Sequence, residues 1–394
     1  MRDGRIATID GLRGIAILLV VWFHVWQISW QAAVIPFVDV SLQPLAETGF
    51  IGVDLFFFIS GFVLLLPYAH AHFTDGPLPS VRHFFSRRFF KIMPSYALCI
   101  AALLVIGYQT YTNLSDALRD VGFHLLFIHD WFSETNGTIN GVMWSLAAEV
   151  QFYLIFPFLA PLFVRRPSLV AFAMVAVAVA WRLWSFTSDH YFIVMRLQQL
   201  PAYLDFFAAG MVGAYVYTHI MIRRPEVAVR RWVFTALSSL GFIAMLLIAN
   251  AYFEPRYDPD WPHQQDLTLR PLLALACLAA GLGSLFAVRG FQRVLANRVL
   301  LFLAAISYNL YLWHQPIARE LLALHLPAFA GADPHDDRAW QLAFWFVAIP
   351  IALGVSTIIT YAFERPILRW GHRLKKPVPP NVEPPLAEPV IQAR

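Results

Sequence analysis

The chain contains ten apolar stretches that are each about as long as a bilayer's hydrocarbon core is thick. Roughly 20 apolar residues in a helix span that core. The stretches cover residues 9–30, 48–68, 88–108, 144–163, 168–186, 200–220, 232–251, 268–288, 300–323 and 340–363. Hydrophobic residues make up 59% of the chain and charged residues 14%, whereas soluble domains average roughly 45–50% and 25%. The sequence therefore predicts an all-α integral membrane protein with about ten transmembrane helices.

Basic residues divide unevenly between the two ends of these predicted helices. If the N-terminus is cytoplasmic, the cytoplasmic side holds 22 of the 29 lysines and arginines and the outer side holds 7. Cytoplasmic loops carry such an excess in membrane proteins. We therefore expect a multi-pass protein of the inner (cytoplasmic) membrane with both termini in the cytoplasm. The net charge of +4 reflects this topology and does not indicate a nucleic-acid partner.

Two segments fall outside the ten stretches. Residues 117–131 are apolar but too short to span a membrane, and we expect a re-entrant or interfacial helix on the outer side. His124 and His129 of this segment could face a cavity. Residues 377–394 are rich in proline, so we expect a disordered cytoplasmic tail after a transmembrane domain of residues 1–376.

Arg13 and His24 are polar residues eleven positions apart in the first apolar stretch. Eleven helical steps leave an angular offset of only about 20° and an axial separation of about 16 Å. Both side chains therefore lie on one stripe of the helix, with Asp10 just before them. Ionisable groups within a membrane span are costly to bury and usually mark a site or a pathway.

Four ionisable residues of different stretches share one predicted depth. His24, Asp54, Glu149 and His314 all lie roughly 8–14 Å below the outer surface when counted at the helical rise per residue. A carboxylate facing lipid would cost at least about 2.5 kcal/mol. A polar chamber in the outer half of the bundle explains their depth. Hydroxyl side chains at similar depth extend this chamber: Ser60, Ser145, Tyr153, Ser307 and Tyr311.

A basic cluster marks the start of the third stretch. Arg88 and Lys91 are i, i+3 neighbours there, so they occupy one face of the predicted helix. Clustered cations at a helix N-terminus are suited to binding phosphate. Two other interpretations stay open, namely ordinary positive-inside charge and contact with anionic membrane lipid.

Five sequence blocks, in this order, resemble membrane-bound acyltransferase family 3. They are DGLRGIA with the following His24, GVDLFFFISGF, SRRFFKIMP, WSLAAEVQFYL and ISYNLYLWHQPI. The resemblance runs from about residue 8 to residue 366. Proteins of this family O-acylate carbohydrates and related acceptors in bacterial envelopes and secondary metabolism.

The resemblance implies roles for individual residues. Arg13 and His24 match the family's Arg-x10-His motif, in which the histidine is regarded as catalytic and the arginine as important near acyl-CoA. Glu149 occupies an acidic position of the fourth block. Arg88 and Lys91 fall where the family usually has Arg-x-x-Arg. Lysine keeps the charge but lacks the bidentate geometry of arginine.

These observations together predict an enzyme that transfers an acyl group, most simply acetyl, from cytoplasmic acyl-CoA to a hydroxyl of a carbohydrate-type acceptor on the outer side. His24 suits a general base because imidazole titrates near neutral pH, and Glu149 would stabilise its imidazolium. The other candidates are Arg13, Arg88, Lys91 and Asp10 for the acyl-CoA, and Asp54, His314, Tyr153 and Tyr311 for the acceptor substrate.

Alternative functions use the same residues. Histidines and carboxylates at one depth could also serve a proton-coupled exporter of a small anionic or glycosidic compound. A metal site of His24, Glu149 and His314 is a third possibility, although no metal is expected. Asp10 and Arg13 could simply form a local pair at the helix end. The sequence does not predict the oligomeric state or the acceptor.

Overall fold

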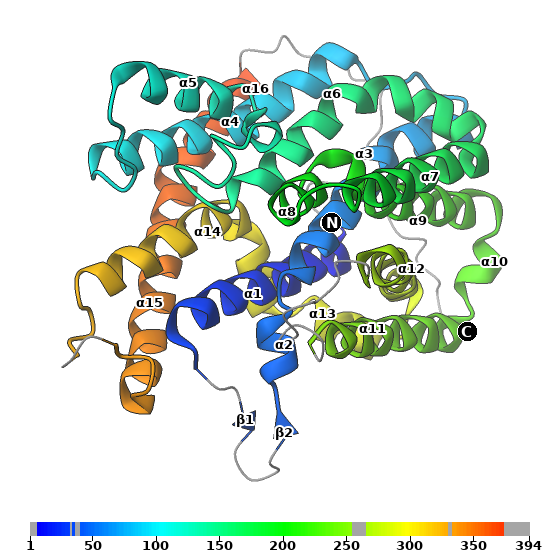
Figure 1. Cartoon of the computed structure of the whole chain (residues 1–394). Helices are drawn as coiled ribbons and strands as arrows, with labels where there is room; N and C mark the ends of the chain where they lie inside the picture. The colour runs from blue at the N-terminus through cyan, green and yellow to red at the C-terminus, as the bar shows by residue number, and fades with distance from the viewer. Residues whose placement is uncertain (1–5, 32–33, 36–39, 254–264, 330–332, 374–394) are drawn as a thin grey trace.

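The computed structural model describes residues 6–31, 34–35, 40–253, 265–329 and 333–373. The described chain is almost entirely helical (Figure 1), and the only strands in these ranges are β1 (Val34–Ile35) and β2 (Val40–Ser41), which pair antiparallel. The predicted all-α fold is confirmed. The proline-rich tail of residues 377–394 and both chain ends lie outside the described residues.

Each predicted apolar stretch corresponds to one long helix. Eight described helices are long and apolar enough to cross a membrane, and the bent pair α13 (Arg289–Leu295) and α14 forms a ninth candidate. Helix α9 is less apolar and accounts for the tenth stretch. The long helices are α1 (Ala7–Ser29), α3 (Ile51–Phe73), α4 (Val81–Val105), α6 (Met143–Arg165), α7 (Pro167–Ser185), α9 (Leu204–Arg223), α11 (Arg231–Phe253), α12 (Gln265–Phe286), α14 (Arg298–Ala323) and α15 (Arg338–Ile358).

Short elements connect or extend the long helices. A π-helical turn, η4 (Ile359–Glu364), continues α15 into α16 (Arg365–Arg373). The other short elements are α2 (Gln43–Glu47), α5 (Leu114–Leu125), η1 (His129–Trp131), α8 (His190–Leu197), η2 (Leu200–Tyr203) and α10 (Pro225–Ala228).

Hydrogen bonds at helix ends bring several basic residues to one face. Arg223 at the end of α9 donates to the carbonyl of Phe73 at the end of α3, at 3.3 Å, and Lys91 in the first half of α4 pairs with Glu364 after α15. We call this end of the bundle, where α1 also begins, the basic face. The other end is called the opposite face.

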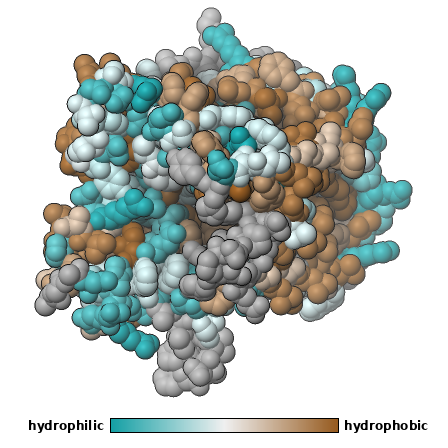
Figure 2. Space-filling view, in the orientation of Figure 1, coloured by the Kyte–Doolittle hydropathy of each residue, from teal (hydrophilic) through white to brown (hydrophobic). Residues whose placement is uncertain are grey.

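The surface of the bundle is suited to a lipid environment. Figure 2 shows a broad hydrophobic surface over α7, α9 and α11, with hydrophilic residues toward the left and right edges of the view. Large apolar side chains such as Phe172 on α7 and Leu247 on α11 are exposed there. Because exposed apolar area on this scale is unfavourable in water, it supports the assignment as a membrane protein.

Small residues allow the central helices to approach closely. A Cβ atom on Gly61 of α3 would overlap the carbonyl oxygen of Phe207 on α9, and a Cβ atom on Gly210 of α9 would overlap the carbonyl oxygen of Phe58 on α3. The two backbones are therefore in reciprocal contact. In membranes, close backbone approach at small residues gives the van der Waals contact that drives helix association.

The connection between α4 and α6 contains the predicted non-spanning helix. Helix α5 is only 12 residues long, which is too short to cross a bilayer. His124 and His129 are buried, and their rings stack with centroids 3.8 Å apart. The two histidines pack against each other and line neither of the two cavities described below.

Asp130 is a buried carboxyl group in the same connection. Its Oδ1 accepts a 2.9 Å hydrogen bond from Gln151, whereas Oδ2 has no hydrogen-bond partner. Burial raises the pKa of Asp130 to about 7, although the bond from Gln151 opposes that shift. A raised folded-state pKa means that this group favours folding most at low pH, and that this contribution is lost as the pH rises through about 7.

We predict that Gly210→Ala destabilises the protein by about 1–3 kcal/mol, because an added methyl group overpacks the contact between α3 and α9. Thermal unfolding of the purified protein in detergent would measure this as a lower Tm. Gly354→Ala is the matched control, since a Cβ atom there meets no atom within 4 Å. Equal Tm values for both variants would contradict the proposed contact.

We predict that Asp130→Asn raises the Tm at pH 8, because asparagine cannot ionise in the buried site. The Tm difference from the natural protein should shrink as the pH falls through 7, and should vanish near pH 4, where the aspartate is protonated. A Tm series in detergent from pH 4 to pH 8 measures this. Asp336→Asn, at an exposed position, should show no such pH-dependent difference.

Candidate functional site

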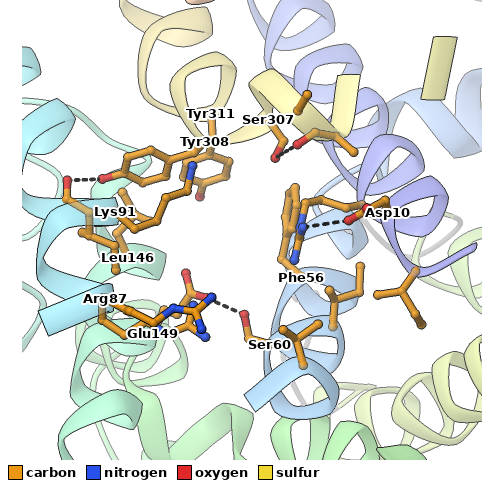
Figure 3. A pocket seen from close by; sticks show the side chains of 18 of the residues that line it. Asp10, Phe56, Ser60, Arg87, Lys91, Leu146, Glu149, Ser307, Tyr308 and Tyr311 are labelled. Atoms are coloured by element: carbon orange, nitrogen blue, oxygen red, sulfur yellow. Dashed lines mark hydrogen bonds and ion pairs between the residues drawn. The ribbon is translucent and has the colours of Figure 1, made fainter. Parts of the chain in front are cut away.

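A cavity of about 560 Å³ extends from the basic face into the bundle. Its walls come from α1, α3, α4, α6, α14 and the segment around η4 and α16. Exposed Arg87 marks the end that reaches the surface, and Tyr311 lies deeper along α14. Figure 3 shows Arg87, Lys91 and Glu149 on one side of the cavity, and Asp10, Phe56 and Ser60 on the other.

The predicted phosphate-binding residues line this cavity. The guanidinium of Arg88 lies 4.9 Å from the ring centroid of Tyr153, and the ammonium of Lys91 lies 5.3 Å from that of Tyr308. Cation–π contacts of this kind hold a cationic side chain in place. The expected position at a helix N-terminus is wrong, because α4 begins at Val81; the positive charge of the wall comes from the side chains of Arg87, Arg88 and Lys91 themselves.

Lys91 is also bound to a carboxylate that the sequence analysis missed. Glu364, in the π-helical turn, pairs with the Lys91 ammonium and accepts a 2.8 Å hydrogen bond from Asn309. Asn309 donates to Thr360 as well, at 2.9 Å. The sequence does show a carboxylate, Glu364, directly after the last apolar stretch. Nothing in the sequence indicates that it pairs with Lys91 of α4, which is more than 270 positions away.

Arg13 and Asp10 form the local pair considered in the sequence analysis. Their side chains meet at 3.2 Å and remain 31% and 21% exposed. Both residues line the cavity. The pair therefore combines the two interpretations, since it stabilises one turn of α1 and also contributes charge to the cavity wall.

Glu149 lies in the cavity and does not contact His24. Its Oε1 accepts hydrogen bonds from the hydroxyls of Ser60 and Tyr153. The expected arrangement of Glu149 beside the His24 imidazole is therefore not observed. The reason is that depth along two helices says nothing about which faces of the helices point at each other.

His24 instead contacts His314. Nδ1 of His24 lies 3.0 Å from Nε2 of His314, and the ring centroids are 4.9 Å apart. Nδ1 of His314 lies 2.9 Å from the carbonyl oxygen of Leu310, and Nδ1 of His24 lies 3.0 Å from that of Val20. The two histidines come from α1 and α14, which are packed against each other along much of their length.

These contacts determine the tautomers of the two neutral rings. A carbonyl oxygen only accepts hydrogen bonds, so Nδ1 of His314 carries a proton and its Nε2 is an acceptor. Nδ1 of His24 faces this acceptor and the carbonyl of Val20, and therefore carries the proton of its own ring. This assignment from the hydrogen-bond network makes Nε2 of His24 the unprotonated, basic nitrogen.

Tyr311 lies between the cavity and the histidine pair. Its ring lines the cavity and is 5.9 Å from the ring of His314. Its hydroxyl lies 2.5 Å from that of Ser145 and donates to the carbonyl of Val142, at 3.0 Å. The structure therefore brings Tyr311 and His314 close to His24, as predicted for one polar level, although His24 itself does not line the cavity.

Asp54 lies apart from the other predicted site residues. It is buried in the first turn of α3, and its charged neighbours include Arg270 and Asp266 of α12. Those two residues form an ion pair at 3.1 Å. Asp54 thus belongs to a separate polar cluster near the opposite face. It does not line the cavity.

The described residues contain no group of three or more His, Cys, Asp or Glu side chains that could hold a metal ion. The metal site considered for His24, Glu149 and His314 does not form, because Glu149 does not join the two histidines. Cys99 and Cys277 are both buried free thiols.

A family profile for an acyltransferase domain, acyltransferase 3, matches residues 6–365. The chain belongs to the acyltransferase-3 family. This match covers the histidine pair, all five sequence blocks and every cavity-lining residue except Leu368 and Gly371. Each of the five blocks contributes residues to the cavity lining.

Similar curated proteins are named as O-acetyltransferases. A Staphylococcus aureus (strain COL) protein assigned as an O-acetyltransferase is 24% identical over 331 residues, covering 78% of this chain and 49% of that protein. The peptidoglycan O-acetyltransferase OatA of Listeria monocytogenes is 23% identical over 380 residues, covering 88% and 56%. The chain spans about half the length of the curated relatives it matches. No solved structure matches.

We predict that Glu364→Ala destabilises the protein by about 1–3 kcal/mol, because it leaves Lys91 and Asn309 without their buried acceptor. The Tm in detergent should fall by several degrees. Glu226→Ala is the matched control, since Glu226 pairs with Arg224 at 3.7 Å on an exposed surface, where ion pairs contribute little. Similar Tm losses in both variants would refute the structural importance of Glu364.

Proposed function

We propose that the protein is a membrane-bound O-acyltransferase that transfers an acyl group, most simply acetyl, from acyl-CoA to a hydroxyl of a carbohydrate-type acceptor. One observation carries this proposal. His24 presents an unprotonated Nε2, its other nitrogen is held by His314, and a cavity with a positively charged wall lies directly below the pair. A base of this kind, next to a site for an anionic donor, suits acyl transfer from a thioester.

The donor would enter the cavity from the basic face. Coenzyme A carries phosphates and a long flexible arm that ends in the thioester. The phosphates would bind at the wall formed by Arg88 and Lys91, with Arg13 and Asp10 on the α1 side. The arm would then extend past Glu149 and Tyr153 toward Tyr311, which lies next to His314.

In the reaction, His24 takes up one proton and later releases it. The acceptor hydroxyl oxygen attacks the thioester carbonyl while Nε2 of His24 takes its proton. The carbon–sulfur bond breaks, and the imidazolium returns the proton to the thiolate. The products are the O-acyl ester and free CoA-SH. His314 orients the His24 ring through the bond to Nδ1 and accepts part of the developing positive charge.

Glu149 would act on the donor and not on His24. Its hydrogen bonds from Ser60 and Tyr153 fix the carboxylate beside Tyr153, over whose ring Arg88 lies. We propose that Glu149 positions the wall that holds the acyl-CoA arm. It therefore remains a functional candidate, with a positioning role in place of the base-stabilising role expected from its depth.

The excess of basic residues supports placing the basic face in the cytoplasm, where acyl-CoA is available. The acceptor would then approach from the opposite, extracytoplasmic face of the inner membrane. The relatives are named as O-acetyltransferases, and OatA of Listeria monocytogenes is named for peptidoglycan. A proton-coupled exporter is the less favoured alternative, because the family profile is that of acyltransferases.

We predict that His24→Ala lowers kcat by about 10²–10⁴-fold, the usual contribution of a general base, while the Kd for CoA stays unchanged. Arg88→Ala and Lys91→Ala should instead raise the KM for acyl-CoA by about tenfold or more, because each removes a charge-assisted contact. The assay follows radiolabel transfer from acetyl-CoA to glycans, using the purified full chain in detergent.

His72→Ala serves as the control, because this imidazole is exposed at the C-terminal end of α3. It lines neither the donor cavity nor the second recess described below. Its kcat and KM should match those of the natural protein. Equal loss of CoA binding in all three site variants would contradict the division of roles. Normal turnover by His24→Ala would refute the proposed base.

A further inference from the structure

A second recess, on the opposite side of the histidine pair, has no role in donor binding. This groove of about 390 Å³ is lined by Trp26, Gln27, Ile28, Trp30, Gln315 and Arg319, and we call it the tryptophan groove. These residues come from the last two turns of α1, from its C-cap Trp30, and from the part of α14 that follows His314.

The histidine pair separates the tryptophan groove from the donor cavity. On α1 and its N-cap, every cavity-lining residue precedes His24, and every groove-lining residue follows it. On α14, likewise, every cavity-lining residue precedes His314 and every groove-lining residue follows it. At the helical rise, Ile28 is about 6 Å beyond His24 and Arg319 is about 7.5 Å beyond His314. The groove thus starts at Trp26 and Gln315, within about 3 Å of helical rise from the histidine pair, and extends at least one helical turn beyond it.

Trp30 is exposed and yet held in a defined position. It is 63% exposed, its backbone N–H donates to the carbonyl of Trp26 at 2.7 Å, and it caps α1 in the left-handed conformation. Its ring lies 5.4 Å from that of His335, whose Nε2 is 2.9 Å from the carbonyl oxygen of Ile28. A fixed, exposed indole presents a flat apolar face on which a sugar ring can stack.

Gln315 brings an unpartnered polar group to the groove. This residue is only 6% exposed and follows His314 directly. Its Oε1 has no hydrogen-bond partner among the described residues. Gln315 thus places an amide group, which can both donate and accept, in the wall of the groove next to His314. Sugar hydroxyls both donate and accept, and would satisfy it.

Arg319 supplies a positive charge at the same groove. No carboxylate of the described chain lies within 4.0 Å of its guanidinium, since it takes part in none of the ion pairs found there. Guanidinium groups bind carboxylates through two parallel hydrogen bonds. Stacking faces, an amide and a guanidinium together match a sugar that carries a carboxylate.

We propose that the tryptophan groove is the acceptor site and that it selects a carboxylate-bearing sugar. The carboxylate binds Arg319, the sugar ring stacks on Trp30, and Gln315 orients a hydroxyl toward Nε2 of His24. This inference rests on the proposed acyl transfer, because the reacting hydroxyl must reach the same base as the thioester, from the other side.

The test compares two soluble probes that differ in one group, a uronic-acid tetrasaccharide and its carboxyl-reduced counterpart. Binding to the purified full chain is measured without any acyl donor, by isothermal titration calorimetry in detergent. The natural protein should bind the acidic probe at least tenfold more tightly than the neutral one. Arg319→Gln should abolish this preference by weakening the acidic probe alone, and Trp30→Ala should weaken both probes.

Matched controls are Arg338→Gln and Trp232→Ala, exposed residues outside the groove, which should bind both probes as the natural protein does. Equal binding of the two probes to the natural protein would overturn the proposal. A charge preference that survives Arg319→Gln would overturn it as well. Unchanged glycan binding by Trp30→Ala would assign that indole to the membrane interface and would also refute the site.

Failure of the acyl-transfer proposal would look different. In that case the acidic probe binds with the Arg319-dependent preference, but the natural protein transfers no radiolabel from acetyl-CoA to it. His24→Ala then causes no further loss of transfer. Conversely, transfer that depends on His24 but shows no change in acceptor preference with Arg319→Gln would keep the enzyme and reject the groove. CoA binding by Arg319→Gln should equal that of the natural protein in either case.

Discussion

The packing of α1 against α14 is the contact on which the site depends. Gly14 of α1 has no room for a Cβ atom, because the backbone of Leu300 on α14 occupies that space. This close approach keeps the two helices in register, so that His24 and His314 meet at 3.0 Å. Gly14, near the start of the two packed helices, thus helps to determine the contact between His24 and His314, ten residues further along α1.

That register also orders everything else along the two helices. Residues before the histidines line a cavity with cations at its surface end, and residues after them line the tryptophan groove. An acyl transfer between substrates from two sides of a membrane needs a base that both substrates can reach. The histidine pair occupies the level between the two recesses, and Tyr311 adjoins it from the cavity side.

Much of this arrangement could be predicted from the sequence, because the relevant signals are periodic and local. The ten helices follow from runs of apolar residues, and Arg13 and His24 lie on one stripe because helical geometry requires it. The partner of His24 could not be predicted in this way. Glu149 was expected beside His24, but its carboxylate contacts Ser60 and Tyr153, because rotation of a helix about its axis depends on what packs against it.

The sequence alone determined the membrane class, the approximate positions of the long helices, the family resemblance and most of the polar residues that line the cavity. Only the tertiary structure decided that His314 orients His24, that Glu364 binds Lys91, and that Asp54 belongs to a different cluster. The physical reason is that depth follows from the rise per residue along one helix. Contacts between helices depend on the side chains that each helix presents to its neighbours, over separations of up to 290 positions.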